Sequence, residues 1–328
     1  MKNIMQRLSR VAATLLQVSA VLLCGAAHAQ NYPNRPVKII VPSSPGGSID
    51  ATARIVGEKL SDIWGQPVVI ENRAGASMRI GAEAASRSAP DGYTLLVAHD
   101  GTMAINPAIY PELRYDPVKS FEPVGILASD PYVILVNADL PIHTVADLLA
   151  FAKKSPEKLN HAGGGASTVL ALELFKALSK TEINNVMYRG GGPSVAAVMS
   201  DESQFTFVDI GSGSSGMASK RIRPIAISST TRHPKFPNLP TIDEAGVKGY
   251  ENTTWMGMFA PAGTPKPVVA AIEKAVQVAL KDPGVRGRLD KIGMDPRSGS
   301  AAEMRDVLAA DMVKWKKLVT EHNIKIGE

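Results

Sequence analysis

The sequence predicts an α/β fold with two similar lobes, and three observations lead to this prediction. Apolar runs of strand length alternate with helical segments along most of the chain. A strand, a glycine-rich loop and a helix follow one another at 37–60, and the same succession returns at 159–178. Three further helical segments close the chain. They can return it to the first lobe, which leaves a cleft between the two lobes.

The segment 37–65 is the clearest unit. Residues 37–41 form a nearly continuous apolar run, as in a strand that is buried on both faces. The residues that follow place five apolar side chains on one helical face: Ile49, Ala53, Val56, Leu60 and Ile63. Ser48 is the expected N-cap of this helix, and Gly65 with Pro67 forms its expected end.

The N-terminus of this helix points at the carboxyl end of the first strand. Unpaired amides and a partial positive charge at such an end attract a carboxylate or a phosphate. The alternative is an ordinary turn between strand and helix, which binds nothing. Strands at 67–71 and 93–98, with a helix at 80–88, predict a parallel sheet whose loops open at one edge, where ligands of α/β proteins bind. The segment 106–119 lacks a clear period, and we expect it to be irregular.

The second half repeats this architecture without a sequence repeat. A strand at 132–137 precedes a helix that ends at Lys154, with Thr144 as N-cap and Asp147 at its third position. Strand, glycine loop and helix then follow one another twice. The remaining segments are strands at 205–210, 224–228 and 254–259, and helices at 267–280, 283–292 and 300–322.

The first 29 residues have the pattern of a secretory signal peptide. Lys2, Arg7 and Arg10 precede an apolar run, and Ala27 to Ala29 form an A-x-A site, which predicts cleavage after Ala29. The rest of the chain would be exported to the periplasm without a membrane-spanning segment. Cys24, the only cysteine, follows Leu23 instead of the small residue of a lipobox, which argues against lipidation.

Composition excludes several classes of function. Without the three basic residues of the leader, 33 Lys and Arg stand against 31 Asp and Glu. This small net charge does not indicate that the protein binds nucleic acid. We expect no disulfide, no metal and no cofactor. GSGSSG at 211–216 matches the dinucleotide fingerprint in its letters, but only residues 217–223 remain for the helix before Pro224. We therefore expect a flexible turn there.

No catalytic constellation is visible in the sequence. The six histidines show no metalloprotease spacing, and neither a nucleophile elbow nor a phosphate-binding loop occurs. His99 and His161 fall at predicted strand ends, where either a ligand contact or a structural hydrogen bond would account for them.

Several ordered blocks resemble one family of proteins. PGGSID, ENRAG, APDGYTLL, YDPVKSF and TWMGMFAPAGTP are similar to the Bug family, the solute receptors of tripartite tricarboxylate transporters. The likeness runs from Tyr32 to Asn323. It implies a type II periplasmic-binding-protein-like fold of two α/β lobes joined by crossover strands, with the ligand cleft between them. Lobe 1 would comprise 30–130 and 253–328, and lobe 2 would comprise 131–252.

The resemblance also implies a set of ligand-binding residues on both lobes. In lobe 1 these are Ser43, Pro45, Gly46, Gly47, Asp50, His99, Gly101 and Thr102, and in lobe 2 Gly164, Gly165, Ser167, Thr168, Arg189, Gly190, Asp209 and Ser212. Arg79 stands where relatives have a small residue. Its guanidinium could form a bidentate pair with a distal carboxylate of the ligand, or it could be solvated. Asp209 stands where relatives often have Asn. This Asp would either favour a hydroxyl or an amine on the ligand or have a structural role. Val169 replaces a histidine that many relatives carry.

The expected function is that of a periplasmic receptor for a small organic carboxylate, such as a di- or tricarboxylate, an amino acid or an aromatic acid. The protein would be a monomer that closes by hinge motion near Asp130 and Asn252, and some relatives deliver their ligand to membrane transporter subunits. Two alternatives remain open. One is an exported enzyme that acts on a carboxylic acid with His99 and Asp100, and the other is a ligand-sensing adaptor for a sensor kinase.

Overall fold

The computed structural model of the protein describes residues 32–188, 190–322 and 324. The predicted signal peptide and Arg189 therefore lie outside the described residues. Within the described part of the chain, no helix is both long and apolar enough to cross a membrane.

The first sheet confirms the predicted parallel arrangement. Its strands β1 (Val37–Val41), β2 (Val68–Asn72) and β3 (Thr94–His99) lie parallel in the order β2-β1-β3. β9 (Thr253–Pro261) then pairs with β3 in antiparallel fashion, with Leu96 opposite Phe259. The helices α2 (Ser48–Trp64) and α3 (Arg79–Ser86) connect the parallel strands, so both begin at the same edge of the sheet. A π-helical turn at Gly101–Ile105 and α4 (Asn106–Ile109) follow β3.

The second sheet is built in the same way. Its strands are β4 (Phe121–Asn137), β5 (Asn160–Gly163), β6 (Asn184–Met187), β7 (Phe205–Asp209) and β8 (Ile222–Ile227). Its helices are α5 (Val145–Lys154), α6 (Ala166–Ser179), α7 (Gly191–Met199) and α8 (Ile210–Met217). β5 pairs in parallel with β6 and β7, and β7 pairs in antiparallel fashion with β4.

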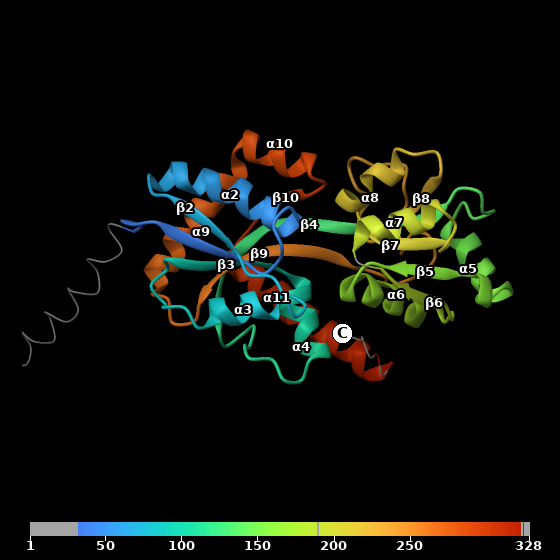
Figure 1. The fold of residues 1–328 in the computed structure, drawn as a ribbon, viewed down its shortest axis with the longest axis horizontal. Helices are drawn as coiled ribbons and strands as arrows, with labels where there is room; N and C mark the ends of the chain where they lie inside the picture. The colour runs from blue at the N-terminus through green and yellow to red at the C-terminus, as the bar shows by residue number, and fades with distance from the viewer. Residues whose placement is uncertain (1–31, 189, 323, 325–328) are drawn as a thin grey trace, which may run out of the picture.

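Two long strands join the lobes (Figure 1). β4 spans 17 residues and belongs to both sheets, and β9 lies antiparallel to its first half. The sequence predicted only 132–137 of β4, because Pro123, Gly125 and Pro131 interrupt the earlier part. Register shifts near Pro123 and Gly125 accommodate those residues. β10 (Asp295–Gly299), which pairs with β4, was not predicted either.

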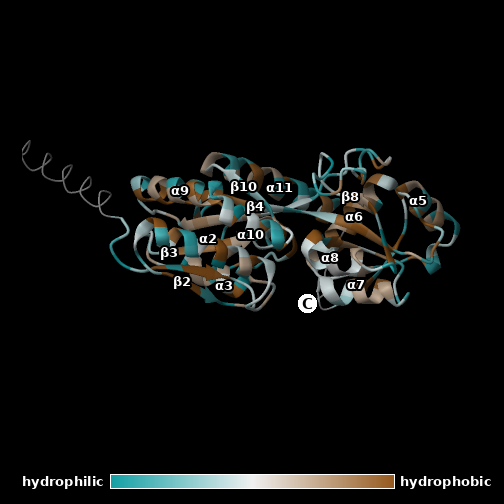
Figure 2. Cartoon of the chain, turned by 90° about the horizontal axis from the view of Figure 1, so that it is seen from above, coloured by the Kyte–Doolittle hydropathy of each residue, from teal (hydrophilic) through white to brown (hydrophobic). Residues whose placement is uncertain are grey.

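The chain returns to the first lobe at its end, as predicted (Figure 1). The returning helices are α9 (Lys266–Lys281), α10 (Pro283–Lys291) and α11 (Ala301–Glu321). Ile272 and Leu280 of α9 are fully buried in one cluster with Val37 and Leu60. Hydrophilic and hydrophobic residues alternate along α9 in Figure 2, and its buried residues recur at helical spacing, so this helix is amphipathic. The boundaries proposed for the lobes stay a prediction, since β4 and β9 run through both of them.

Four local predictions need correction. The segment 106–119 is not irregular throughout, because its first four residues form α4. Gly47, not Ser48, occupies the N-cap of α2, and no side chain caps that helix, whereas Gly65 ends it in the left-handed region as expected. Ile63 is exposed. The segment 211–216 is not a flexible turn but lies in α8, because Asp209 caps this helix by accepting a hydrogen bond from Ser212 N at 2.6 Å.

Candidate functional site

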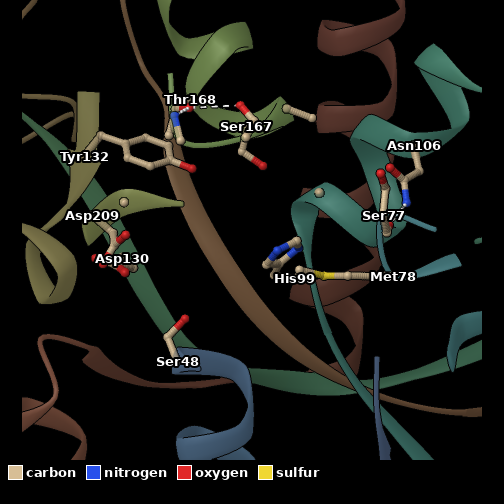
Figure 3. A pocket seen from close by; sticks show the side chains of 15 residues that line it. Ser48, Ser77, Met78, His99, Asn106, Asp130, Tyr132, Ser167, Thr168 and Asp209 are labelled. Atoms are coloured by element: carbon tan, nitrogen blue, oxygen red, sulfur yellow. Dashed lines mark hydrogen bonds between the residues drawn. The ribbon is translucent and has the colours of Figure 1, made fainter. Parts of the chain in front are cut away.

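A cavity of about 340 Å³ lies between the two lobes and is lined by residues of both. This volume is at the lower end of the range of small-molecule sites. The strand β4 and the ends of both sheets contribute to it (Figure 3). The lining residues are Ser48, Ser77, Met78, His99, Gly101, Asn106, Asp130, Tyr132, Gly164, Gly165, Ala166, Ser167, Thr168, Gly191 and Asp209.

Helix N-termini surround this cavity. Ser48 and Gly191 are the first residues of α2 and α7, and Met78 and Gly165 are the N-caps of α3 and α6. The first amides of a helix lack partners within it and carry a partial positive charge. No Lys or Arg occurs among the described residues that line the cavity. Backbone amides and dipoles are therefore the attraction that this part of the structure offers to an anion.

Glycines allow the N-termini of α6 and α7 to approach each other. A Cβ atom on Gly164 would lie 2.9 Å from Gly190 C, and one on Gly191 would lie 2.8 Å from Ser212 Cβ. Any larger residue at these positions would push the loops apart. Thr168 fixes the loop before α6, because its Oγ1 accepts a hydrogen bond from Gly164 N at 2.8 Å and donates one to Gly165 O at 2.9 Å.

The loop before α2 is held by its own carboxylate. Asp50, which is 3% exposed, accepts hydrogen bonds from Gly46 N, Arg54 and Asn72. Burial opposes the charge of Asp50, but these hydrogen bonds outweigh it and lower the pKa of the carboxyl group. The Gly46 amide is thus engaged with Asp50, and of this loop region only Ser48 lines the cavity.

His99 lines the cavity as a neutral imidazole. Burial lowers its pKa to about 4. Its Nδ1 accepts a hydrogen bond from Thr102 N at 3.2 Å, and it lies 3.8 Å from Asp100 Oδ1, beyond hydrogen-bond distance. Burial, and next the charge of Asp311, raises the pKa of Asp100 to about 7, and Asp100 does not line the cavity. The two residues named for an enzyme therefore do not form a catalytic pair in this structure.

Seven of the predicted site residues line the cavity together: His99, Gly101, Gly164, Gly165, Ser167, Thr168 and Asp209. Ser43, Pro45, Gly46, Gly47, Asp50, Arg79, Thr102, Gly190 and Ser212 lie outside its lining. Arg189 lies outside the described residues. Arg79 instead stacks over the ring of Tyr110, with its guanidinium carbon 3.9 Å from the ring centre.

Eight further residues line the cavity: Ser48, Ser77, Met78, Asn106, Asp130, Tyr132, Ala166 and Gly191. Ala166 and Gly191 lie in the two glycine loops of lobe 2 that the family likeness marks as ligand-binding, and the other six were not predicted. Asp130 and Tyr132 lie two residues apart on β4, which places their side chains on one face of the strand. The sequence offered one signal for these two residues, because an acidic and an aromatic side chain lie there beside the predicted hinge near Asp130. Ser77, in the loop before α3, and Asn106, the first residue of α4, are joined by a hydrogen bond from Asn106 Nδ2 to Ser77 O at 2.8 Å, which no local pattern predicts.

The chain is similar to known proteins in both sequence and fold. A family model described as the tripartite tricarboxylate transporter family receptor matches residues 52–324. Protein BugT of Bordetella pertussis is 31% identical, over 91% of this chain and 92% of its own. A structure of an R. palustris protein with adipate is 33% identical, with a TM-score of 0.80, and covers 90% of this chain and 99% of its own. MatC from Rhodopseudomonas palustris with bound malate is 30% identical, with a TM-score of 0.76, and covers 88% of this chain and 100% of its own.

Proposed function

Because this chain belongs to the family of tripartite tricarboxylate transporter receptors, we propose that it binds a small organic carboxylate in the cavity between its lobes. The observation that carries this proposal is the convergence of helix N-termini on a cavity whose described lining includes no Lys or Arg. A carboxylate can accept several backbone amide hydrogen bonds there, each worth about 1.5–3 kcal/mol when the acceptor is charged. The relatives determined with adipate and with malate support this class of ligand.

The protein acts as a receptor and not as an enzyme. A receptor needs a cavity and a conformational change, whereas hydrolysis or group transfer needs an aligned acid, base or nucleophile. In the described cavity, Nδ1 of His99 accepts a hydrogen bond from the backbone amide of Thr102 and forms no hydrogen bond with Asp100. The ligand would be carried in the periplasm by a monomer, after removal of the leader at Ala29, and passed to membrane transporter subunits.

A thermal-shift screen tests the proposal. The chain from residue 30 onward is mixed with mono-, di- and tricarboxylates, including malate and adipate, and its melting temperature is recorded. At one hundred times its dissociation constant, a true ligand should add about 2.7 kcal/mol of stability. Mass spectrometry of the mixture after incubation should recover the acid unchanged. A screen without any shift would contradict the binding role, and conversion of an acid would contradict the receptor role.

A further inference from the structure

We propose that the ligand carries a protonated amine in addition to its carboxylate, and that Asp130 and Asp209 bind this amine. The inference rests on the proposed function, because it concerns the same cavity. It narrows the class of ligand from organic carboxylates in general to amino-carboxylates.

The two acids lie side by side on neighbouring strands. Asp130 is on β4 and Asp209 ends β7, and the two strands are antiparallel with Tyr132 opposite Asp209. Both acids line the cavity, where Figure 3 shows them close together beside the crossover strand. They come from segments 79 residues apart, and only the pairing of β4 with β7 brings them together.

Each acid has one oxygen engaged and one available. Ile210 N donates to Asp130 Oδ1 at 3.3 Å, and Ser212 N donates to Asp209 Oδ1 at 2.6 Å. No other described residue donates a hydrogen bond to either side chain, and neither acid forms an ion pair within residues 32–188 and 190–322. Asp130 is 3% exposed, so its second oxygen has little access to water except through the cavity.

A buried carboxyl group beside a second, half-buried one is unfavourable when no described cation compensates them. Burial, and next the charge of Asp209, raises the pKa of Asp130 well above its ordinary value. A ligand ammonium would relieve this repulsion and supply three hydrogen-bond donors to the available oxygens. A second ligand carboxylate at the same place would instead lie beside two acidic side chains and, when ionised, would supply no hydrogen-bond donor.

Other walls of the cavity favour an anion, whereas the two acids favour a cation. The N-termini of α6 and α7 lie within the same cavity as the two acids, and they favour an anion. A cavity with helix N-termini on some walls and two acids on another matches a molecule with a carboxylate at one end and an ammonium at the other.

Matched ligands test the inference. Adipate and 5-aminopentanoate share a chain of four methylenes and differ only in the group at one end. Succinate and 3-aminopropanoate share two methylenes and differ in the same way. Titration calorimetry should show that the wild-type protein binds at least one of the two amino acids at least tenfold more tightly than the matching diacid. Preference for the diacid in both pairs would overturn the inference and leave the proposed function in place. Failure of every carboxylate in the thermal-shift screen would overturn the proposed function itself.

Two isosteric variants assign the effect to the acids. Asp209→Asn keeps an oxygen that can cap α8, and Asp130→Asn keeps an acceptor for Ile210 N, so both should fold. Each should weaken binding of the preferred amino acid at least tenfold and reduce the preference over the diacid. Asp282→Asn is the control, because it removes one charge from the N-cap of α10, outside the cavity. Equal losses in all three variants, or tight binding of Mg²⁺ or Ca²⁺ alone that the two variants abolish, would overturn the assignment to an amine.

Discussion

Single side chains show two ways in which this protein buries polar groups. Asp50 keeps its charge, since three neighbouring groups donate hydrogen bonds to it. His161 is buried without charge: Phe207 N donates to its Nε2 at 3.1 Å, which leaves its Nδ1 to donate to Asn185 Oδ1 at 2.8 Å. His161 is fully buried in β5 and does not line the cavity, so of its two interpretations the structural one is confirmed.

His161 should make the protein sensitive to acid. Burial lowers its pKa to about 4, compared with about 6.5 in an unfolded chain. Between these values the unfolded state binds more protons, so the free energy of unfolding falls as the pH falls from 6.5 to 4. The loss should reach about 3 kcal/mol, at 1.36 kcal/mol for each pH unit. Urea unfolding of the wild-type protein across this pH range measures the slope.

The variant His161→Gln should flatten this slope even if it lowers stability at pH 7. His143→Gln is the control, since His143 is an exposed histidine. If both variants kept the wild-type slope, the acid sensitivity would arise elsewhere, and His99, with its pKa also lowered to about 4 by burial, would be the next residue to test.

Helix ends in this protein are determined by short-range chemistry. α5 begins with a capping box in which Asp147 N donates to Thr144 Oγ1 and Thr144 N donates to Asp147 Oδ2. This confirms the predicted N-cap. The N-caps of α6 and α7 are instead Gly165 and Gly190, which have positive φ and no side chain to cap the helix. Their amides remain available, which is why these two helices, and not α5, can serve a ligand.

Removal of the cap of α5 should destabilise the protein without affecting the cavity. Thr144→Ala loses the acceptor for Asp147 N and should lower the free energy of unfolding by about 1 kcal/mol. Thr144→Ser keeps a hydroxyl in place and should cost much less. Urea unfolding measures both, and calorimetry with the best ligand of the screen should give the same dissociation constant for both. Equal stability of the two variants would show that the capping hydrogen bond contributes little.

The whole molecule is held together by more than its two crossover strands. Gly211 at the start of α8 lies against Gly293, which follows α10. Nearby, His233 Nε2 lies 2.7 Å from Asp295 Oδ1, and this contact joins the loop after β8 to β10. On another face, Leu170 of α6 is fully buried in a cluster with residues of the first lobe. A hinge near Asp130 and Asn252 remains a prediction. Because these contacts also join the lobes, a closing motion that changes the angle between the lobes has to rearrange them.

The contact between two glycines should tolerate no side chain. A Cβ atom on Gly293 would lie 2.6 Å from both Cα and N of Gly211, and Gly293 has φ +85°. Gly249→Ala is a matched control, with φ +79° and no atom within 4 Å of the added Cβ. Both variants carry the strain of a left-handed alanine, about 1 kcal/mol. Gly293→Ala should lose about 1–3 kcal/mol more through overpacking, as measured by thermal unfolding. Equal melting temperatures would mean that the lobes separate at this contact at little cost.

The sequence by itself determined the local elements and their order. Apolar periods predicted α2, α9 and α11, and glycine loops predicted where helices begin at the sheet edges. These signals suffice because a helix or a buried strand depends mainly on neighbours within a few residues. The family likeness added seven residues that do line the cavity.

Tertiary structure alone decided the rest. The part of β4 from Phe121 to Pro131 contains Pro, Gly and Asp, and it is a strand because β9 and β10 supply its hydrogen bonds. The segment 211–216 is helical because Asp209 caps it and its glycines fit against Ile292 and Val208. Asp130 lines the cavity beside Asp209 because β4 pairs with β7, which lies far along the chain. The pairing of distant strands depends on contacts that no local period encodes, so it becomes visible only in the folded protein.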